Sequence, residues 1–598
     1  MRHPYRSFAT RMLHFIAAGR SPRSVGRTFT RAVVAPLSLL AALSAGMTGT
    51  AHAAADAPAE ALAKLDVAQP VMQCADLKSA DLANGGPIAG TVTSAEVSGG
   101  GDTGFCDVKG TVEGRIHFEA RLPLQTYTQR FLMIGCGGYC GMVNIDNGGV
   151  DAAAKGCAPL TSNRVATVAT DLGHKGDYPD GAWAKDNPTA VVDLAYSGMH
   201  ATTVVVKNLV TKYYGKAPAK SYYSGCSDGG REGLHEAQRY PTDYDGMLVG
   251  APVIDEVETN TFYHAWNVRV NSKPDGSPIL TANKIPALVK AVTQACGDAG
   301  GLVQDPRACT FDPRTIACAK GQDDDTCLTQ EQIAVVRKIW SGPVDEHGRH
   351  LTAGDMPIGG EAGWLGGMVP KHVGDPIGLK NSADKAFSWD FPNYMAQFGA
   401  PTGITNANMA FTSAEYTKLT KLDGLWNPTN PDLRAFIAHG GKLVIWHGWA
   451  DTGASPFTTL NYVSKVKAFV GADAFDKFAR LYMIPGVYHC NGGPSPATED
   501  FLTPLMSWVE TGTAPDKVVV NFVKSEKDDT VLKSRPVFPY PSTVRYAGGD
   551  INSADSYVRA DVPAGVSDVY DFAGLKHYSP GNQMACSVDG DHVHCVNH

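Results

Sequence analysis

The feature that most constrains the fold is a Gly-Cys-Ser-Asp-Gly pentapeptide at 225–229, in which a serine lies between two glycines. Residues 220–224 before it are typical of a strand, and residues 231–240 after it are typical of a helix that ends near Pro241. Glycines on both sides of a serine allow a sharp strand-to-helix turn, because the backbone can pass close to its neighbours there. This context favours a nucleophilic Ser227 over a simple turn of small residues.

Two downstream patterns supply the base and the acid that a nucleophilic serine requires. An apolar segment at 442–446 is followed by a turn with Asp451, and a second at 478–484 is followed by His489. Both residues come just after a predicted strand, where open α/β sheets place functional side chains. The order serine, acid, histidine is that of the α/β-hydrolase fold. We therefore predict this fold, with Ser227 as nucleophile, His489 as base and Asp451 as the carboxylate that orients the base.

Other interpretations of these residues stay open on the sequence alone. His447 precedes the acid and His174 precedes the serine, so each breaks the chain order and is expected to be a hydrogen-bonded loop residue or part of a pocket wall. A metal-dependent hydrolase would instead use His447, Asp451 and His489 as ligands. An inactive binding scaffold is a further class, and the complete set of serine, acid and histidine argues against it.

The sequence between nucleophile and acid is much longer than the few strand–helix units expected there. Residues 131–135 and 165–169 are predicted core strands, and residues 187–213 a long helix. An insertion is predicted between the nucleophile and the acid, where it can cover the active site as a lid. The predicted organisation is a signal peptide at 1–53, a first hydrolase part at 54–252, a lid domain at 253–431 and a second hydrolase part at 432–598.

The N-terminal segment has the pattern of an export signal. Four arginines precede an apolar stretch at 32–45 that is too short to cross a bilayer, and Ala51-His52-Ala53 fits a cleavage site. The arginines are Arg20, Arg23, Arg27 and Arg31. A periplasmic or secreted protein without a membrane span is expected. The formal net charge is −8 and a basic patch is lacking, so no nucleic-acid partner is expected.

Several motifs together resemble the tannase/feruloyl esterase family of serine esterases, which includes bacterial mono(hydroxyethyl) terephthalate hydrolases. The resemblance runs from about Cys74 to the end of the chain, and its motifs are GCSDGGREG (225–233), QRYP (238–241), YDG (244–246), GAP (250–252), HGWAD (447–451) and PGVYHC (485–490). It implies a secreted serine esterase that hydrolyses aromatic carboxylic esters of the gallate or hydroxycinnamate type through an acyl-enzyme. The alternative within the family is a terephthalate-monoester hydrolase.

The cysteines give an independent argument for the site. Cys226 precedes the predicted nucleophile and Cys490 follows the predicted base, so the two are close and bonded if the triad is right; free thiols are the alternative. The resemblance and local spacing imply four more pairs, which are Cys74–Cys106, Cys296–Cys309, Cys318–Cys327 and Cys586–Cys595. Cys136, Cys140 and Cys157 remain, of which two can bond. A zinc cluster is disfavoured because no C-x-x-C pair occurs.

An oxyanion hole needs backbone N–H donors. In this fold one donor is the residue after the nucleophile, here Asp228. Matching the glycine-rich loop at 135–141 to the family's oxyanion loop points to Gly138 as the other, within one residue; a turn without a catalytic role is the alternative.

This chain departs from the family's pattern in two places. Many lids of the family bind calcium in an acidic loop, but here the corresponding run keeps only Asp298 and Asp305. No cofactor is therefore expected to be required, and these two residues are weak candidates for a structural calcium site. Terephthalate-monoester hydrolases of the family carry a lid arginine and an aromatic residue after the acid. Here no arginine occurs between Arg349 and Arg434, and Thr452-Gly453-Ala454 follows the acid.

Further candidates are named on the sequence. Lys380 or Lys385 could replace the lid arginine, although lysine cannot form a bidentate fork. Residues 591–598 could bind a metal through their histidines, but a surface tail held by a disulfide is preferred. Lid aromatic residues that could stack on a phenolic ring, or that form the lid core, are Trp364, Trp389, Phe391, Tyr394 and Phe398.

Overall fold

The computed structural model describes residues 62–146, 153–354, 356–377, 383–398, 401–590 and 592–597. The predicted signal peptide at 1–53 lies outside the described residues. Among the described helices, none combines the length and the apolar character needed to cross a membrane.

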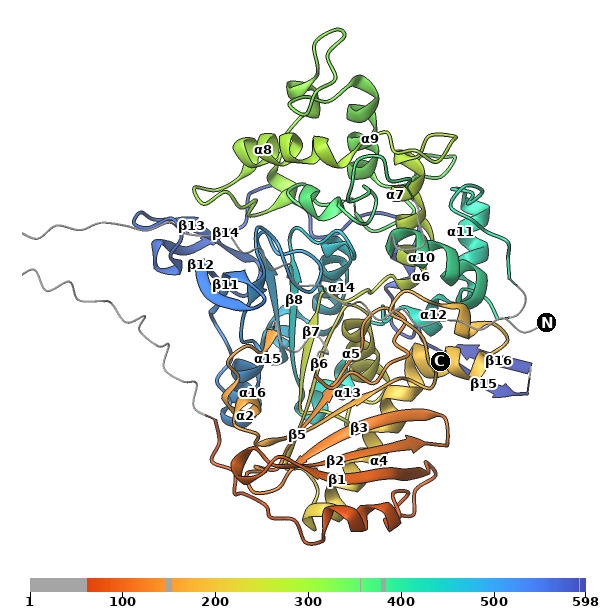
Figure 1. Cartoon of the computed structure of the whole chain (residues 1–598), viewed down its shortest axis with the longest axis vertical. Coiled ribbons are helices and arrows are strands. Elements are labelled where there is room, and N and C mark those ends of the chain that lie inside the picture. Colours follow the sequence, from red (N-terminus) through yellow and green to blue (C-terminus); the bar gives the residue numbers. More distant parts are fainter. Residues whose placement is uncertain are drawn as a thin grey trace, which may run out of the picture. The chain divides into compact units, whose positions relative to one another are not determined.

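A nine-stranded sheet organises the chain in the order β1-β2-β3-β5-β4-β6-β7-β8-β9 (Figure 1). The strands from β5 to β9 in this order are parallel. At the other edge, β1, β2 and β3 are antiparallel and join the parallel part through β5. The strands are β1 (Gly90–Ser98), β2 (Phe105–Val112), β3 (Ile116–Pro123), β4 (Arg130–Ile134), β5 (Val165–Thr170), β6 (Lys220–Cys226), β7 (Gly246–Gly250), β8 (Lys442–Gly448) and β9 (Ala479–Ile484).

The burial of the strands follows from their place in the sheet. All residues of β4 and β7 are buried, as expected for parallel strands that are covered on both faces, whereas β2 and β3 alternate between buried and more exposed residues. Successive residues of β4 enter two different cores, because neighbouring side chains point to opposite faces. Phe131 and Met133 belong to one core, and Leu132 and Ile134 to the other. The sheet therefore lies between two apolar layers.

Helices cover both faces. Apolar side chains of α4, α5 and α14 enter the core that contains Met133, and those of α16 enter the core that contains Leu132. The predicted helix at 187–213 is present but is interrupted by a π-helical turn at Asp193–Ser197. The helices are α2 (Ala158–Thr161), α3 (Pro188–Val192), α4 (Gly198–Tyr214), α5 (Asp228–Arg239), α6 (Glu256–Glu258), α7 (His264–Asn271), α8 (Ile285–Cys296), α9 (Gln330–Ser341), α10 (Ala383–Asp390), α11 (Ser413–Leu419), α12 (Asp423–Trp426), α13 (Arg434–His439), α14 (Pro456–Val470), α15 (Ala472–Phe478) and α16 (Leu502–Thr511).

The segment between β7 and β8 contains the helices from α6 to α13, and its described residues add no strand to the large sheet. We call this segment the helical insert. It has an apolar core of its own, to which Leu288, Val336 and Trp364 contribute. Figure 1 shows α7, α8 and α9 together at the top of the view, beyond the large sheet. The insertion predicted from the long spacing between Ser227 and Asp451 corresponds to this segment.

The C-terminal part forms three small sheets. The first contains β10 (Ala497–Thr498), β11 (Val518–Ser525) and β12 (Asp528–Val537). The others are the pairs β13 (Ser542–Tyr546) with β14 (Tyr557–Asp561) and β15 (Met584–Asp589) with β16 (His592–Asn597). The histidines at 592 and 594 lie exposed on this last hairpin.

Twelve of the 13 cysteines are paired in six disulfides. All five expected pairs are present. The three cysteines whose pairing stayed open divide into a Cys136–Cys140 disulfide and a buried free thiol at Cys157.

Candidate active site

Ser227 lies at the turn between β6 and α5, in a backbone conformation that serines rarely adopt. Its φ is 66° and its ψ −122°, a strained arrangement of the kind that structures retain at functional sites. The flanking glycines are required by close packing: a Cβ on Gly225 would lie 2.6 Å from the carbonyl oxygen of Gly229, and one on Gly229 would lie 2.8 Å from that of Cys136. The helix begins at Asp228, earlier than the predicted residue 231.

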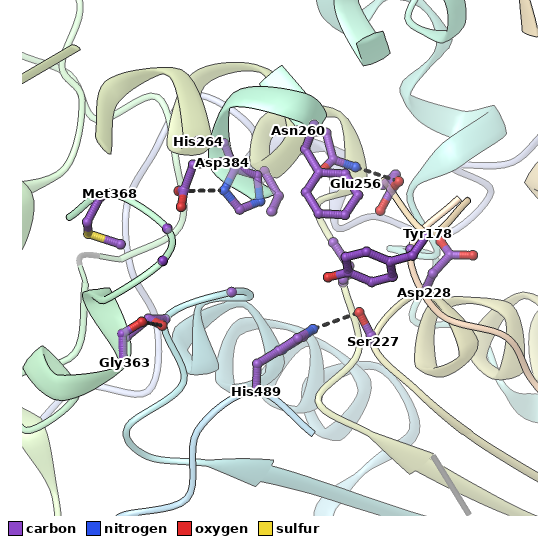
Figure 2. Close-up of a pocket in the computed structure, with 18 residues that line it drawn as sticks. Tyr178, Ser227, Asp228, Glu256, Asn260, His264, Gly363, Met368, Asp384 and His489 are labelled. Carbon is purple, nitrogen blue, oxygen red and sulfur yellow. Dashed lines mark hydrogen bonds and ion pairs between the residues drawn. The ribbon is translucent and has the colours of Figure 1, made fainter. Parts of the chain in front are cut away.

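The structure brings the three predicted triad residues into one hydrogen-bonded chain. His489 Nε2 lies 2.7 Å from Ser227 Oγ, and His489 Nδ1 lies 2.8 Å from Asp451 Oδ2. Asp451 is fully buried, whereas the side chain of His489 is 23% exposed. Figure 2 shows His489 and Ser227 facing each other across the floor of a pocket. This is the nucleophile, base and orienting-carboxylate arrangement of serine hydrolases.

The charges of the pair reinforce one another. Burial lowers the pKa of His489, but the charge of Asp451 and the hydrogen bond to it outweigh burial and raise that pKa above its ordinary value. Burial by itself would raise the pKa of Asp451, but His489 and His447 hold it well below its usual range. Asp451 is therefore an anion at neutral pH, and it stabilises the imidazolium that forms when His489 accepts a proton.

His447, a competing histidine on the sequence, supports the acid instead. Its Nε2 lies 3.1 Å from Asp451 Oδ2, and its Nδ1 lies 2.8 Å from Thr459 Oγ1. The other carboxylate oxygen, Oδ1, accepts backbone N–H bonds from Gly453 and Ala454. Because both nitrogens of His447 bond to protein groups, this side chain fixes the position of Asp451. The order of His447 and Asp451 in the sequence gave no sign of this contact.

His174, the other competing histidine, contacts the glycine-rich loop. Its Nε2 is 2.6 Å from the carbonyl oxygen of Tyr139, and its ring stacks on Trp183 at 3.5 Å between centroids. Burial lowers the pKa of His174, so the neutral ring donates this bond. His174 thus holds the glycine-rich loop at 135–141. It is a hydrogen-bonded loop residue, as expected from the sequence.

The predicted oxyanion donors flank the serine. Gly138 lines the same pocket as Ser227 and has φ +59°. Asp228 is the first residue of α5, so its N–H has no acceptor inside the helix. The side chain of Asp228 points away into an ion pair with the fully buried Arg231. The two backbone N–H groups are therefore available for a ligand at Ser227.

Two cavities meet at the triad and share Tyr178, Ser227 and His489 in their walls. The insert-side cavity has a volume of about 210 Å³ and lies between the triad and the helical insert. The loop-side cavity has a volume of about 440 Å³ and is lined by the glycine-rich loop and by the Cys226–Cys490 disulfide. An ester needs room on both sides of its carbonyl carbon, and the site provides it.

The insert-side cavity has one polar wall. Glu256, Asn260 and His264 are spaced four residues apart on one helical stretch and face the cavity together (Figure 2). Asn260 Nδ2 donates to Glu256 Oε1 at 2.6 Å, and His264 Nδ1 lies 2.8 Å from Asp384 Oδ1. Burial and the nearby Asp228 raise the pKa of Glu256 to about 8. The described residues of this wall include no lysine or arginine.

The aromatic residues of this cavity are not those named on the sequence. Tyr178 and Phe387 line it, with their rings edge to face at 5.5 Å. None of the five insert aromatic residues named on the sequence lines it. Trp364 and Phe391 are buried core residues, which was the alternative expected for them, and Trp389 lines a separate surface pocket. Tyr178 could not have been found by inspection, because it belongs to an irregular loop without a motif.

The lysine candidates receive no support from this geometry. Lys380 lies outside the described residues, and the side chain of Lys385 is not among those described. After the acid, Gly453 packs against the base, since a Cβ there would lie 2.8 Å from the His489 ring. A large side chain has no room at that position.

The calcium candidates do not fit a calcium site. Asp298 accepts two backbone N–H bonds and one from Gln304, and Arg535 Nε lies 3.7 Å from it. Asp305 pairs with Arg307 at 2.6 Å. Calcium requires roughly six to eight oxygen ligands, whereas the carboxylates here are bound by N–H donors and guanidinium groups.

Comparisons with known proteins identify the family of this chain. The family described as "Tannase and feruloyl esterase" matches residues 101–560. The chain is 31% identical over 523 residues to a mono(2-hydroxyethyl) terephthalate hydrolase from Piscinibacter sakaiensis, an alignment that covers 77% of this chain and 85% of that protein. It is 32% identical over 431 residues to a probable feruloyl esterase from Arthroderma benhamiae, with coverage of 67% and 75%.

Solved structures show the same fold. Feruloyl esterase B from Aspergillus oryzae superposes with a TM-score of 0.68 at 24% identity and covers 79% of this chain and 97% of its own. Tannin acyl hydrolase from Aspergillus niger gives a TM-score of 0.61 at 20% identity, with coverage of 84% and 93%. The predicted α/β-hydrolase fold is confirmed. The chain belongs to the tannase and feruloyl esterase family and is a carboxylic ester hydrolase.

Proposed function

We propose that this protein is a serine esterase that hydrolyses aromatic carboxylic esters, of the gallate or hydroxycinnamate type, through an acyl-enzyme. The observation that carries the proposal is the bonded chain from Ser227 Oγ through His489 to Asp451, which opens directly on a cavity with aromatic and carboxyl groups in its walls. The names of the relatives, a terephthalate-monoester hydrolase and feruloyl esterases, support aromatic esters as the substrate class.

In the mechanism, Ser227 Oγ attacks the ester carbonyl carbon while His489 Nε2 takes its proton. The negative oxygen of the tetrahedral intermediate accepts hydrogen bonds from the backbone N–H groups of Asp228 and Gly138. His489 returns the proton to the leaving alcohol, and Asp451 keeps the ring in the tautomer that has Nε2 free to accept. Water then attacks the acyl-enzyme with His489 again acting as base, and the aromatic acid is released.

The polar wall of the insert-side cavity supports hydroxylated rings as the acyl group. Phenolic hydroxyl groups donate hydrogen bonds, and Asp384 and Glu256 offer carboxyl oxygens that accept them. A substrate with a second carboxylate would meet Asp384 without a guanidinium partner on the described walls, which is electrostatically unfavourable. A gallate or hydroxycinnamate ester therefore suits this cavity better than a terephthalate monoester.

The helical insert is proposed to act as a lid that forms the acyl-binding wall, since α6, the π-helical turn Thr259–Tyr263, α7 and α10 supply its polar residues. We also infer export to the periplasm or medium. Six disulfides support this, because such bonds persist in oxidising compartments.

The test is hydrolysis of a small ester panel by the purified protein and by its Ser227→Ala variant. The panel contains methyl gallate, methyl ferulate, methyl p-coumarate, a terephthalate monoester and p-nitrophenyl acetate. A preference for gallate or ferulate that is abolished in the variant is expected. If the terephthalate monoester is the preferred substrate, the proposed substrate class is wrong. Equal turnover by the wild type and Ser227→Ala would exclude the serine mechanism.

A matched pair of substrates tests the role of the polar wall. Methyl p-coumarate and methyl cinnamate differ only by the ring hydroxyl group. Asp384→Asn should lower kcat/KM for the coumarate ester about tenfold, the cost of one hydrogen bond to a charged group, and should leave the cinnamate ester nearly unchanged. Equal losses on both esters would mean that Asp384 supports the helical insert and does not contact substrate.

A further inference from the structure

The glycine-rich loop contains three residues with positive φ, one of which is not a glycine. Gly138 and Gly141 have φ of 59° and 84°, and Cys140 has φ of 55° although it is not a glycine. A non-glycine residue in this left-handed region costs roughly 1–2 kcal/mol. The loop that contains the proposed donor Gly138 therefore needs tertiary contacts to keep its shape.

One such contact is the Cys136–Cys140 disulfide, which joins residues four apart on either side of Gly138. The bond closes a small covalent ring that contains the donor. Inside this ring the N–H of Cys140 donates to the carbonyl oxygen of Gly137 at 3.1 Å, which completes a tight turn. With both ends tied, the peptide that presents the Gly138 N–H has few alternative conformations.

The second contact comes from Glu232, a fully enclosed side chain on α5, the helix that starts at the nucleophile turn. Its Oε2 accepts the Cys136 N–H at 3.3 Å and lies 3.0 Å from the hydroxyl oxygen of Tyr223. Its Oε1 lies 2.9 Å from Cys136 Sγ and 3.3 Å from Cys140 Sγ. A disulfide sulfur has no proton to donate, so a neutral carboxyl group whose own proton faces the sulfurs fits this contact.

The electrostatic surroundings of Glu232 agree with a neutral carboxyl group. Burial, and then the negative charge of Asp228, raise the pKa of Glu232 well above its ordinary value. Arg231 opposes this shift, but it is already engaged by Asp228. Glu232 thus connects the loop to the helix of the nucleophile without placing a second charge beside the reacting centre.

We propose that the Cys136–Cys140 disulfide and Glu232 are positioning groups for the oxyanion hole: they hold the Gly138 N–H at a fixed place relative to Ser227. The inference rests on the proposed serine mechanism and gives a role to one disulfide and one carboxyl side chain that the triad does not require. Their effect is on the transition state, because the donor binds the oxygen only when negative charge has developed on it.

The first experiment compares two double variants of the full-length protein. Cys136→Ala/Cys140→Ala opens the ring around Gly138, and Cys586→Ala/Cys595→Ala removes a disulfide from the C-terminal hairpin as a control. For the first we expect kcat on a p-nitrophenyl ester to fall between about tenfold and 100-fold, approaching the loss of one oxyanion donor, with KM within about threefold of wild type. The control should keep kcat within about twofold.

Inhibition by phenylboronic acid gives a readout that a merely structural role would not change. Boron forms a tetrahedral adduct on the serine and places an oxygen where the oxyanion develops, so it is a transition-state analogue. Its inhibition constant should rise by the same factor as kcat falls. Unchanged kcat and unchanged boronate affinity in Cys136→Ala/Cys140→Ala would overturn the assignment of the disulfide.

Glu232 provides an independent test if the cysteine variant does not fold. Glu232→Gln keeps a neutral side chain whose oxygen can accept the Cys136 N–H, and Glu232→Ala removes the acceptor. We expect the glutamine variant to retain kcat within about threefold and the alanine variant to lose about tenfold or more, with a matching loss of boronate affinity. Equal activity of the alanine variant and the wild type would overturn the role of Glu232.

Ser227→Ala distinguishes a failure of the proposed serine mechanism from a failure of the positioning role. If this variant retains turnover, the serine mechanism fails and the positioning role fails with it. If Ser227→Ala is inactive while both positioning variants remain fully active, only the present inference is refuted.

Discussion

Gly138 offers the sharpest test of the oxyanion assignment, because its neighbour provides a matched control. In Gly138→Ala the new Cβ would lie 2.3 Å from the carbonyl oxygen of Tyr178 and 2.5 Å from a ring carbon of the same residue. A backbone oxygen cannot rotate away as a flexible side chain can, so the loop itself must move. In Gly137→Ala the new Cβ meets no atom within 4 Å.

The size of the effect follows from two separate costs. Displacing one oxyanion donor lowers kcat by about 10²–10³, which corresponds to roughly 2.7–4 kcal/mol of transition-state stabilisation. Alanine at φ +59° adds backbone strain of roughly 1–2 kcal/mol to the folded state. We therefore expect Gly138→Ala to lose at least about 100-fold in kcat and to unfold at a lower temperature. KM should stay within about threefold, because the ground-state ester carbonyl carries little charge.

The assay is steady-state hydrolysis of p-nitrophenyl acetate, with thermal unfolding measured in parallel. Gly137→Ala should keep kcat within about threefold of wild type, since its Cβ points into open space. The assignment of Gly138 as an oxyanion donor is refuted if Gly138→Ala keeps more than about one third of wild-type kcat. A loss confined to Gly137→Ala would move the donor by one residue along the loop.

Three further predictions concern charge. The acid limb of kcat/KM should lie above pH 6.5, since the base must be neutral and the pKa of His489 is raised above that value. Asp451→Asn should lower kcat about 10⁴-fold. Both effects are measured in pH–rate profiles of the wild type and the variant. KM for methyl p-coumarate should fall as the pH increases through about 8, where Glu256 ionises and becomes a stronger acceptor for the ring hydroxyl group, and Glu256→Gln should abolish this fall in the same titration. Excess EDTA should leave activity and the thermal midpoint unchanged, since Asp298 is bound by N–H donors; a fall in either would contradict our assignment of that loop.

The local elements of the fold were predictable because they depend on short-range patterns. The strand–turn–helix around Ser227, the strands that precede Asp451 and His489, and the length of the helical insert can each be read from contiguous residues. Fully buried parallel strands produce unbroken apolar runs, and glycines mark turns where a Cβ would clash. The start of α5 was predicted three residues late because the helix begins inside the motif itself, at Asp228.

The walls of the site were not predictable in this way. Asp384 and Phe387 come from α10, Glu256 and His264 from another part of the insert, and Tyr178 from a loop before the nucleophile. Each lies in an ordinary stretch of sequence, and only their convergence gives them a common role. Aromatic residues of the insert were expected to lie mostly in its core, because the insert needs such side chains for its own stability.

The sequence by itself indicated the family and the chain order of the three predicted triad residues, because motifs and chain order carry that information along the backbone. The resemblance to the family, together with local spacing, implied four of the disulfides, and the predicted triad implied the fifth, Cys226–Cys490. Tertiary structure alone decided that His447 supports Asp451, that Cys136 pairs with Cys140, and that Glu232 connects their loop to α5. The first two contacts join residues only four positions apart, and the third joins residues 96 positions apart. Their energy depends on distance and burial in space, which no local pattern of residues specifies.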